Sequence, residues 1–134
     1  MTRTGGCRCG AIRYTLSAEP IATRLCWCRD CRSWALGNGA VNILVPGGAV
    51  SVGGTPRHWE STADSGNRMA RAFCPDCGTQ LFSESSGNPL NMVIRVGTLD
   101  DATGIAPTAV IWTDSAPGGG RFDPALEAFP RQPG

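Results

Sequence analysis

The sequence CPDCG occupies residues 74–78, and the related sequence CRCG occupies residues 7–10. Each places two cysteines within one turn and follows them with a glycine, which relieves the backbone where it bends around the sulfurs. Two such pairs supply the four thiolates that a structural zinc ion binds in a closed tetrahedron. We therefore predict a structural zinc site that staples the start of the chain to its middle, with the ligands Cys7, Cys9, Cys74 and Cys77.

An alternative for these cysteines is a redox dithiol of Cys74 and Cys77, with the other pair merely buried. Redox Cys-x-x-Cys motifs usually open a helix between two strands, and the residues around Cys74 do not have that pattern. The sequence therefore favours the structural zinc.

The remaining three of the seven cysteines, Cys26, Cys28 and Cys31, lie in one short segment. A zinc ion with three protein ligands keeps one position open for water or substrate, which is typical of a catalytic zinc. Such a position can bind a small thiol as its thiolate near neutral pH. Two alternatives stay open: a second structural zinc closed by His58, the only histidine, or a trio without stable metal, as free or disulfide-linked cysteines.

Several arginines are candidates for binding an anionic ligand. Arg29 and Arg32 lie in or next to the trio, and we assign them as speculative contacts to an acidic thiol. Arg24 and Arg71 are further candidates for holding the carboxylates of a peptide-like ligand, although isolated arginines are usually solvated.

Other residues near these motifs carry weaker signals. Trp27 and Trp34 flank the trio and are candidates for the wall of a pocket, although packing is the commoner role of such aromatic residues. His58 is expected to be a partly exposed strand residue rather than a general base. The segment 97–101 is expected to form a capped turn and not a pair of catalytic carboxylates.

Composition limits the class of protein. The 134 residues are the length of one domain, and we assign residues 1–134 to a single zinc-binding domain. With 12 basic and 11 acidic residues and no basic run, nucleic acid is not an expected partner. No apolar stretch has the length of a signal peptide core or a membrane span, so we expect a cytoplasmic protein. The 18 glycines and 10 prolines favour short strands and turns, hence a mainly β fold.

Strand-like patterns recur between the turns. Residues 29–34 have room only for one or two helical turns after the segment 21–25, and the tail, 117–134, is expected to be loop-rich with one turn near 125–129. Alternating or β-branched segments predict strands at residues 11–17, 41–45, 50–52, 58–61, 68–73, 80–83, 92–96 and 109–112.

Four stretches together carry a family resemblance: residues 6–14, 26–32, 73–79 and 96–101. From about residue 5 to about residue 112, the chain resembles the glutathione-dependent formaldehyde-activating enzyme family, which includes centromere protein V. The resemblance implies a β-tent fold of small antiparallel sheets, a structural zinc on the four paired cysteines and a second zinc on the trio. It also implies the condensation of glutathione with formaldehyde to S-hydroxymethylglutathione, which is the reverse of a carbon–sulfur lyase reaction.

The leading hypothesis is thus a zinc-dependent enzyme of the carbon–sulfur lyase type, in which Cys26, Cys28 and Cys31 form the catalytic site. Its partners would be a small thiol such as glutathione and a small aldehyde such as formaldehyde. The alternative is a non-enzymatic zinc module that binds a protein partner, with the trio weakly occupied or vacant. A redox or metal-sensing trio is a third possibility.

Overall fold

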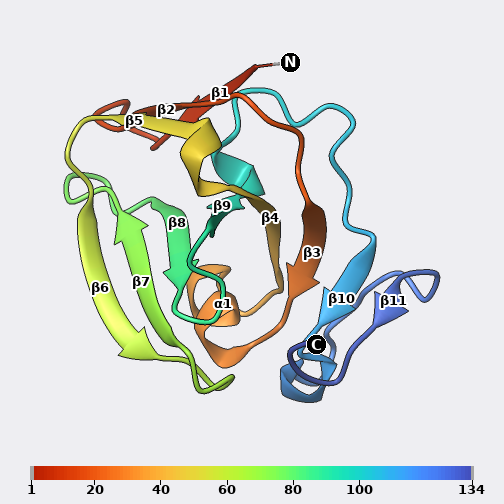
Figure 1. The fold of residues 1–134 in the computed structure, drawn as a ribbon. Coiled ribbons are helices and arrows are strands. Elements are labelled where there is room, and N and C mark those ends of the chain that lie inside the picture. Colours follow the sequence, from red (N-terminus) through yellow and green to blue (C-terminus); the bar gives the residue numbers. More distant parts are fainter. Residues whose placement is uncertain (1, 134) are drawn as a thin grey trace.

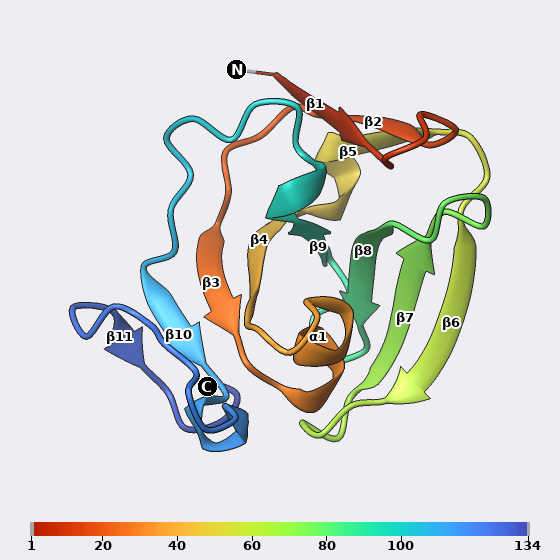
Figure 2. The same ribbon diagram turned by 180° about the vertical axis from the view of Figure 1, so that it is seen from behind.

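The strand-like segments of the sequence pair into two sheets (Figures 1 and 2). The structure is a computed structural model that describes residues 2–133. Its strands are β1 (Arg3–Gly6), β2 (Arg13–Leu16), β3 (Ala22–Cys26), β4 (Ala40–Pro46), β5 (Val50–Gly53), β6 (Arg57–Thr62), β7 (Arg68–Phe73), β8 (Gln80–Ser85), β9 (Asn91–Arg95), β10 (Ala109–Ile111) and β11 (Glu127–Ala128). The helices are α1 (Arg29–Trp34) and the 3-10 turns η1 (Gly47–Ala49), η2 (Val96–Thr98) and η3 (Thr113–Ser115).

The smaller sheet has three antiparallel strands in the order β1-β2-β5. Alternation in β2 buries Tyr14 and Leu16 and leaves the residues between them exposed, so one face of the sheet packs on the core. The Tyr14 hydroxyl lies 2.8 Å from Thr98 Oγ1 and ties this face to η2. Strand β1 was not expected from the sequence. It forms because Gly5, with no side chain, can lie directly against the Tyr14 ring.

The larger sheet has eight strands in the order β11-β10-β3-β4-β9-β8-β7-β6. Its pairs from β3 to β6 are antiparallel, and β10 is parallel to both β3 and β11. The fold is mainly β, as predicted, but one of its sheets is larger than expected and mixed in direction. The C-terminal tail has a turn at 124–125, at the start of the predicted region, and then contributes the unpredicted strand β11, beside which the Phe129 amide donates to the Val110 carbonyl at 2.9 Å.

Two clusters of buried side chains hold the fold together. The first packs the β2 face against residues of β4, β8 and β9, including Ile43, Val45 and Ile94, which are fully buried. The second lies at the end of β3 and joins two of the trio cysteines to Trp27, Val110 and Ile111. Both groups of cysteines therefore touch the core: Cys7 and Cys74 belong to the first cluster, and Cys26 and Cys31 belong to the second.

The large sheet curves round a common interior, and α1 lies at one end of that interior (Figures 1 and 2). Contacts with the paired strands β6 and β7 hold the helix: Asp30 pairs with Arg71 of β7 at 3.1 Å, and Trp34 meets Trp59 of β6 edge-on. The helix spans the predicted residues 29–34. Within residues 2–133, no helix is long and apolar enough to cross a membrane.

Candidate metal centres

The four paired cysteines come together from two turns that are distant in sequence. One turn follows β1 and carries Cys7 and Cys9, and the other joins β7 to β8 and carries Cys74 and Cys77. All four Sγ atoms lie within 4.8 Å of one another. The Cys7–Cys9 and Cys9–Cys74 sulfur distances are 3.6 and 3.7 Å. Zn–S bonds of about 2.3 Å in a tetrahedron place sulfurs about 3.8 Å apart, so this cluster fits a zinc ion.

Backbone geometry in both turns aims the sulfurs inward. Gly10 and Gly78, each directly after the second cysteine of its pair, have φ values of 85° and 79°, in the left-handed region that favours glycine. The Ile12 amide donates to Cys7 Sγ at 3.2 Å, and the Thr79 side chain contacts Cys77 Sγ at 3.2 Å. The Thr79 hydroxyl and backbone amide lower the pKa of Cys77 to about 5, which favours the thiolate that a metal requires.

The trio comes from the junction of β3 and α1. Cys26 ends β3, Cys28 is the N-cap of α1 and Cys31 lies in its first turn. The Cys28 sulfur accepts a hydrogen bond from the Cys31 amide at 3.4 Å, so the helix cap itself fixes the sulfur. The three Sγ atoms lie within 4.8 Å of one another, which also fits a single metal ion.

A fourth ligand to the trio is not found in the described part of the chain. Among the His, Cys, Asp and Glu side chains of residues 2–133, none joins the three sulfurs within that distance. His58 is exposed on β6, as expected for a strand histidine, and lines a different cavity beside Phe82. The alternative of a second structural zinc closed by His58 is therefore wrong, and the cluster offers three ligands.

Two polar side chains, from β4 and β9, point at Cys31. Asn42 Nδ2 lies 3.8 Å from Cys31 Sγ, and an Arg95 guanidinium nitrogen lies 3.7 Å from it. The same nitrogen donates to Asn42 Oδ1 at 2.8 Å, which locks the two side chains together. Hydrogen bonds from Cys26 and Cys28 to Cys31 first, and then the Arg95 charge and the Asn42 amide, hold the pKa of Cys31 well below its usual value.

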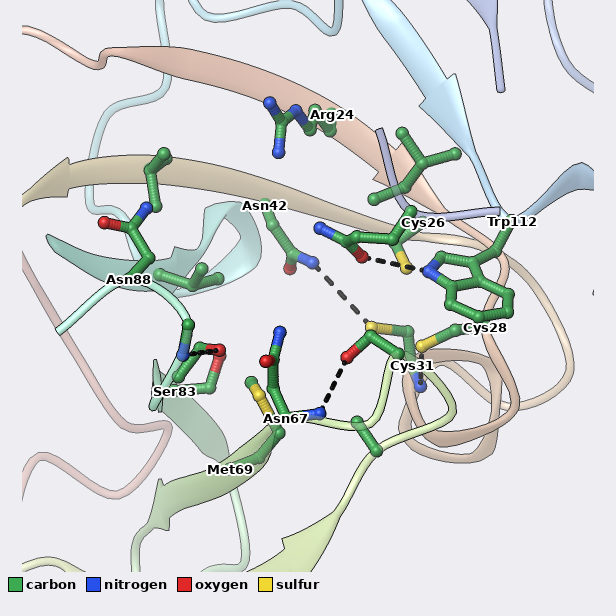
Figure 3. Close-up of a pocket in the computed structure, with 18 of the residues that line it drawn as sticks. Arg24, Cys26, Cys28, Cys31, Asn42, Asn67, Met69, Ser83, Asn88 and Trp112 are labelled. Atoms are coloured by element: carbon green, nitrogen blue, oxygen red, sulfur yellow. Dashed lines mark hydrogen bonds between the residues drawn. The ribbon is translucent and has the colours of Figure 1, made fainter. Parts of the chain in front are cut away.

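The trio opens into a cavity of about 350 Å³ (Figure 3). This volume is within the range of small-molecule sites. The wall is of mixed character and carries three arginines; among its polar and aromatic lining residues are Arg24, Asn42, Asn67, Arg71, Ser83, Asn88, Arg95 and Trp112. The Cys7/Cys9/Cys74/Cys77 cluster lines neither this cavity nor the one beside His58.

The predicted arginines separate into two groups. Arg24 and Arg71 lie on the cavity wall, as does Arg95, which sequence reasoning missed. Arg29 is exposed on α1, and neither it nor Arg32 is among the residues that line this cavity. The assignment of these two arginines as ligand contacts therefore stays a prediction from the sequence, and the wall points to the other three.

The predicted aromatic wall is found only in part: Trp34 lines a neighbouring cavity together with Cys31 and Arg95, but neither predicted tryptophan lines the cavity of Figure 3. Trp27 is 1% exposed and packs in the second apolar cluster, while Trp34 lies under Arg71, whose guanidinium is 5.0 Å from the ring centroid. Trp112 lines the cavity instead. Its φ of 61° is rare for a bulky residue, and its indole donates to Gln132 Oε1 at 3.0 Å. Strained backbone of this kind is concentrated at functional sites.

Asn42, Arg95 and Trp112 were missed because no local motif marks them. A signal does exist for two of them. Asn42 is directly opposite both Arg24 and Arg95 in the sheet, and side chains directly opposite across strands share a face. Recognising this row needs the strand register, which a single sequence does not provide.

Comparisons with known proteins show the fold and the family of the chain. Among solved structures, the chain is similar to a Rhodobacter sphaeroides protein determined by structural genomics, with 21% identity, coverage of 78% of this chain and 91% of that chain, and a TM-score of 0.59. That likeness shows a shared fold. No curated protein matches the chain. The family described as "Glutathione-dependent formaldehyde-activating enzyme" matches residues 2–115. Because this match spans most of the sequence, the chain belongs to the glutathione-dependent formaldehyde-activating enzyme family.

Proposed function

We propose that the protein is an enzyme that adds a small thiol, such as glutathione, to a small aldehyde, such as formaldehyde. In this reaction the thiol sulfur forms a bond to the carbonyl carbon, the carbon–oxygen π bond breaks, and the thiol proton ends on the oxygen. The product with formaldehyde and glutathione is S-hydroxymethylglutathione. The reverse direction is a carbon–sulfur lyase reaction.

One observation carries the proposal: three sulfurs from a single segment converge within 4.8 Å at the edge of a cavity of about 350 Å³. Three ligands leave a coordination position free, and the cavity gives a small molecule access to it. A purely structural site has neither feature. The non-enzymatic alternative does not account for a cavity with three arginines beside this cluster.

Cys26, Cys28 and Cys31 would hold the metal. A bound zinc ion lowers the pKa of a thiol, so that the thiolate is available near neutral pH. The chain's own residues would then position the reactants. Arg95 and Asn42 fix Cys31 from the sheet side, and Arg95 supplies positive charge where thiolates gather.

The other cluster would be structural. Cys7, Cys9, Cys74 and Cys77 complete a four-sulfur set by themselves. A zinc ion there would join the turn after β1 to the turn between β7 and β8. The seven cysteines are unpaired, which suits a reducing compartment such as the cytoplasm.

The proposal is tested by counting zinc and by watching the reaction. We expect two zinc ions per chain by elemental analysis, one of which responds to glutathione. With ¹³C-formaldehyde, exchange between formaldehyde and S-hydroxymethylglutathione should be faster with the protein than in buffer. The Cys28→Ser variant should not raise the exchange rate above that in buffer. One zinc per chain with no rate above background would refute the proposal and favour the non-enzymatic module.

A further inference from the structure

A row of polar side chains crosses the concave face of the large sheet. Arg24 of β3, Asn42 of β4 and Arg95 of β9 are direct cross-strand partners, so all three side chains point to the same face. All three line the cavity, and Figure 3 shows Arg24 and Asn42 of this row. Cys26 lies two residues beyond Arg24 on the same strand and therefore points the same way. The row thus leads directly from the trio to Arg24.

The arginines of this cavity differ in what neutralises them. Arg71 is buried and pairs with Asp30 at 3.1 Å, and its NH1 group donates to Ser61 at 3.1 Å. Arg95 is directed at Cys31 and Asn42. Arg24 is half-buried, and within residues 2–133 its side chain has neither an ion pair nor a hydrogen bond. Of the three positive charges on the wall, only that of Arg24 is left for a ligand.

The acidic residues of the wall do not cancel this charge. Asp64 is the one carboxylate among the lining residues within 2–133, and it lies in the exposed turn between β6 and β7 without an ion pair to Arg24. The amides of Asn42, Asn67 and Asn88 and the hydroxyl of Ser83 complete a wall rich in hydrogen-bond donors. Such a wall suits an anion.

We propose that Arg24 binds a carboxylate of the thiol substrate, so that the enzyme selects carboxylate-bearing thiols over neutral ones. This inference rests on the proposed function, because it assumes that a thiol binds at the trio. Residues two apart on a strand are roughly 7 Å apart, so a ligand whose sulfur lies at the trio can reach Arg24 with a carboxylate a few bonds away. The planar guanidinium can hold it with two parallel hydrogen bonds.

The test compares a matched pair of ligands, 3-mercaptopropionate and 3-mercaptopropionamide, which differ in one charge. Binding to the zinc-loaded protein is measured by titration calorimetry, which does not depend on catalysis. Hydrogen bonds to charged groups predict that the wild type prefers the carboxylate by about 10- to 100-fold. Arg24→Gln should abolish that preference by weakening only the binding of 3-mercaptopropionate. Arg24→Lys should restore part of the preference.

Arg29→Gln is measured as well, because the sequence predicted a ligand contact there, and Arg57→Gln is the matched control, because it removes the same charge from an exposed position outside the cavity wall. It should keep the wild-type preference, which excludes a general effect of net charge. Comparing each variant with the wild type on the same two ligands cancels any difference in their thiol pKa values. Zinc content and circular dichroism verify that each variant is folded.

The outcomes separate the two proposals. If both thiols bind the wild type equally well, or if Arg24→Gln keeps the preference, the role of Arg24 is overturned and the proposed function stands. If the preference is lost in Arg29→Gln instead, the carboxylate lies at the helix and not on the sheet. If neither ligand nor glutathione binds the zinc-loaded wild type, the proposed function fails, and the inference fails with it.

Discussion

The two cysteine clusters use the same side chain in opposite settings. Cys7, Cys9, Cys74 and Cys77 come from two turns that are 65 residues apart in sequence, and their four sulfurs form a complete ligand set by themselves. The trio comes from one strand–helix junction and faces a cavity whose wall carries three arginines. A metal ion in the first cluster would hold distant segments together. A metal ion in the second would join only neighbouring residues of one segment, and its open coordination position would be available for a ligand.

The largest effect is expected from Cys74→Ser. Cys74 is fully buried, and its cluster joins the N-terminal turn to the turn between β7 and β8. A structural zinc contributes roughly 10–16 kcal/mol, which is comparable to the net stability of a whole domain. We expect this variant to lose most of its folded population and both zinc ions, as measured by circular dichroism and elemental analysis. A soluble variant with wild-type thermal stability would contradict the structural role.

In the second cluster, we expect Cys28→Ser to remove the metal without unfolding the protein. Serine is a good N-cap, so the start of α1 keeps its hydrogen-bond acceptor while the metal site loses a ligand. We expect zinc to fall from two ions per chain to one and thiol binding to be lost, with a melting temperature within a few degrees of the wild type. A global loss of structure would show that the trio is also a staple, and would remove the contrast between the clusters.

The cysteines of both clusters could be predicted from the sequence, but several residues around the trio could not. Ligand spacing such as Cys-x-x-Cys is a local property, so all seven sulfurs could be sorted from the sequence into the two groups that the structure brings together. The surroundings of the trio were much less predictable. Arg29 was chosen because it adjoins the cysteines, but the helix turns it outward. Arg95 is 64 residues from Cys31 in sequence and reaches it only through strand pairing.

The fold shows the same division between local and long-range information. Alternation predicted most strands, and α1 spans the expected residues. The parallel pairing of β10 with β3 and the short strand β11 depend on contacts between distant segments that have weak patterns of their own. Strand β1 contains two glycines and lacks alternation, and it is stabilised by its partner β2.

Arg95→Gln sharpens the comparison by changing the charge of one cluster only. Three thiolates and a divalent zinc ion sum to one negative charge, and the buried Arg95 guanidinium lies 3.7 Å from Cys31 Sγ. A bound thiolate adds a second negative charge. We expect glutathione to bind about tenfold more weakly, because a charged hydrogen-bond donor is removed from a buried site. Calorimetry on the zinc-loaded protein measures this change.

Arg57→Gln is the control for that variant, because it removes the same charge from an exposed position on β6. It should leave glutathione affinity unchanged. The structural zinc should be retained in both variants, since Arg95 does not touch the four-cysteine cluster. Equal affinities of the two variants for glutathione would show that Arg95 has only a packing role.

The smallest effect is expected at the ion pair that holds the strands flanking the first cluster. Arg13 on β2 donates to Asp100, and Thr4 of β1 donates to the same carboxylate at 2.7 Å. The Arg13 and then the Thr4 hydrogen bonds lower the pKa of Asp100 to about 2. Because the folded pKa is depressed, the stabilisation is complete above the usual aspartate value of about 4 and is lost as the pH falls towards 2. At pH 7 the pair is therefore fully ionised.

Asp100→Asn should consequently lower the melting temperature at pH 7, but by no more than a few degrees, because the pair is solvent-exposed and screened. The difference from the wild type should shrink in 1 M salt, which screens exposed charges within about 3 Å. Zinc content should remain two ions per chain, since the sulfurs do not depend on this carboxylate. A drop that persists in high salt together with loss of one zinc ion would mean that Asp100 positions the turn carrying Cys7 and Cys9, and that the first cluster, too, depends on a charged neighbour.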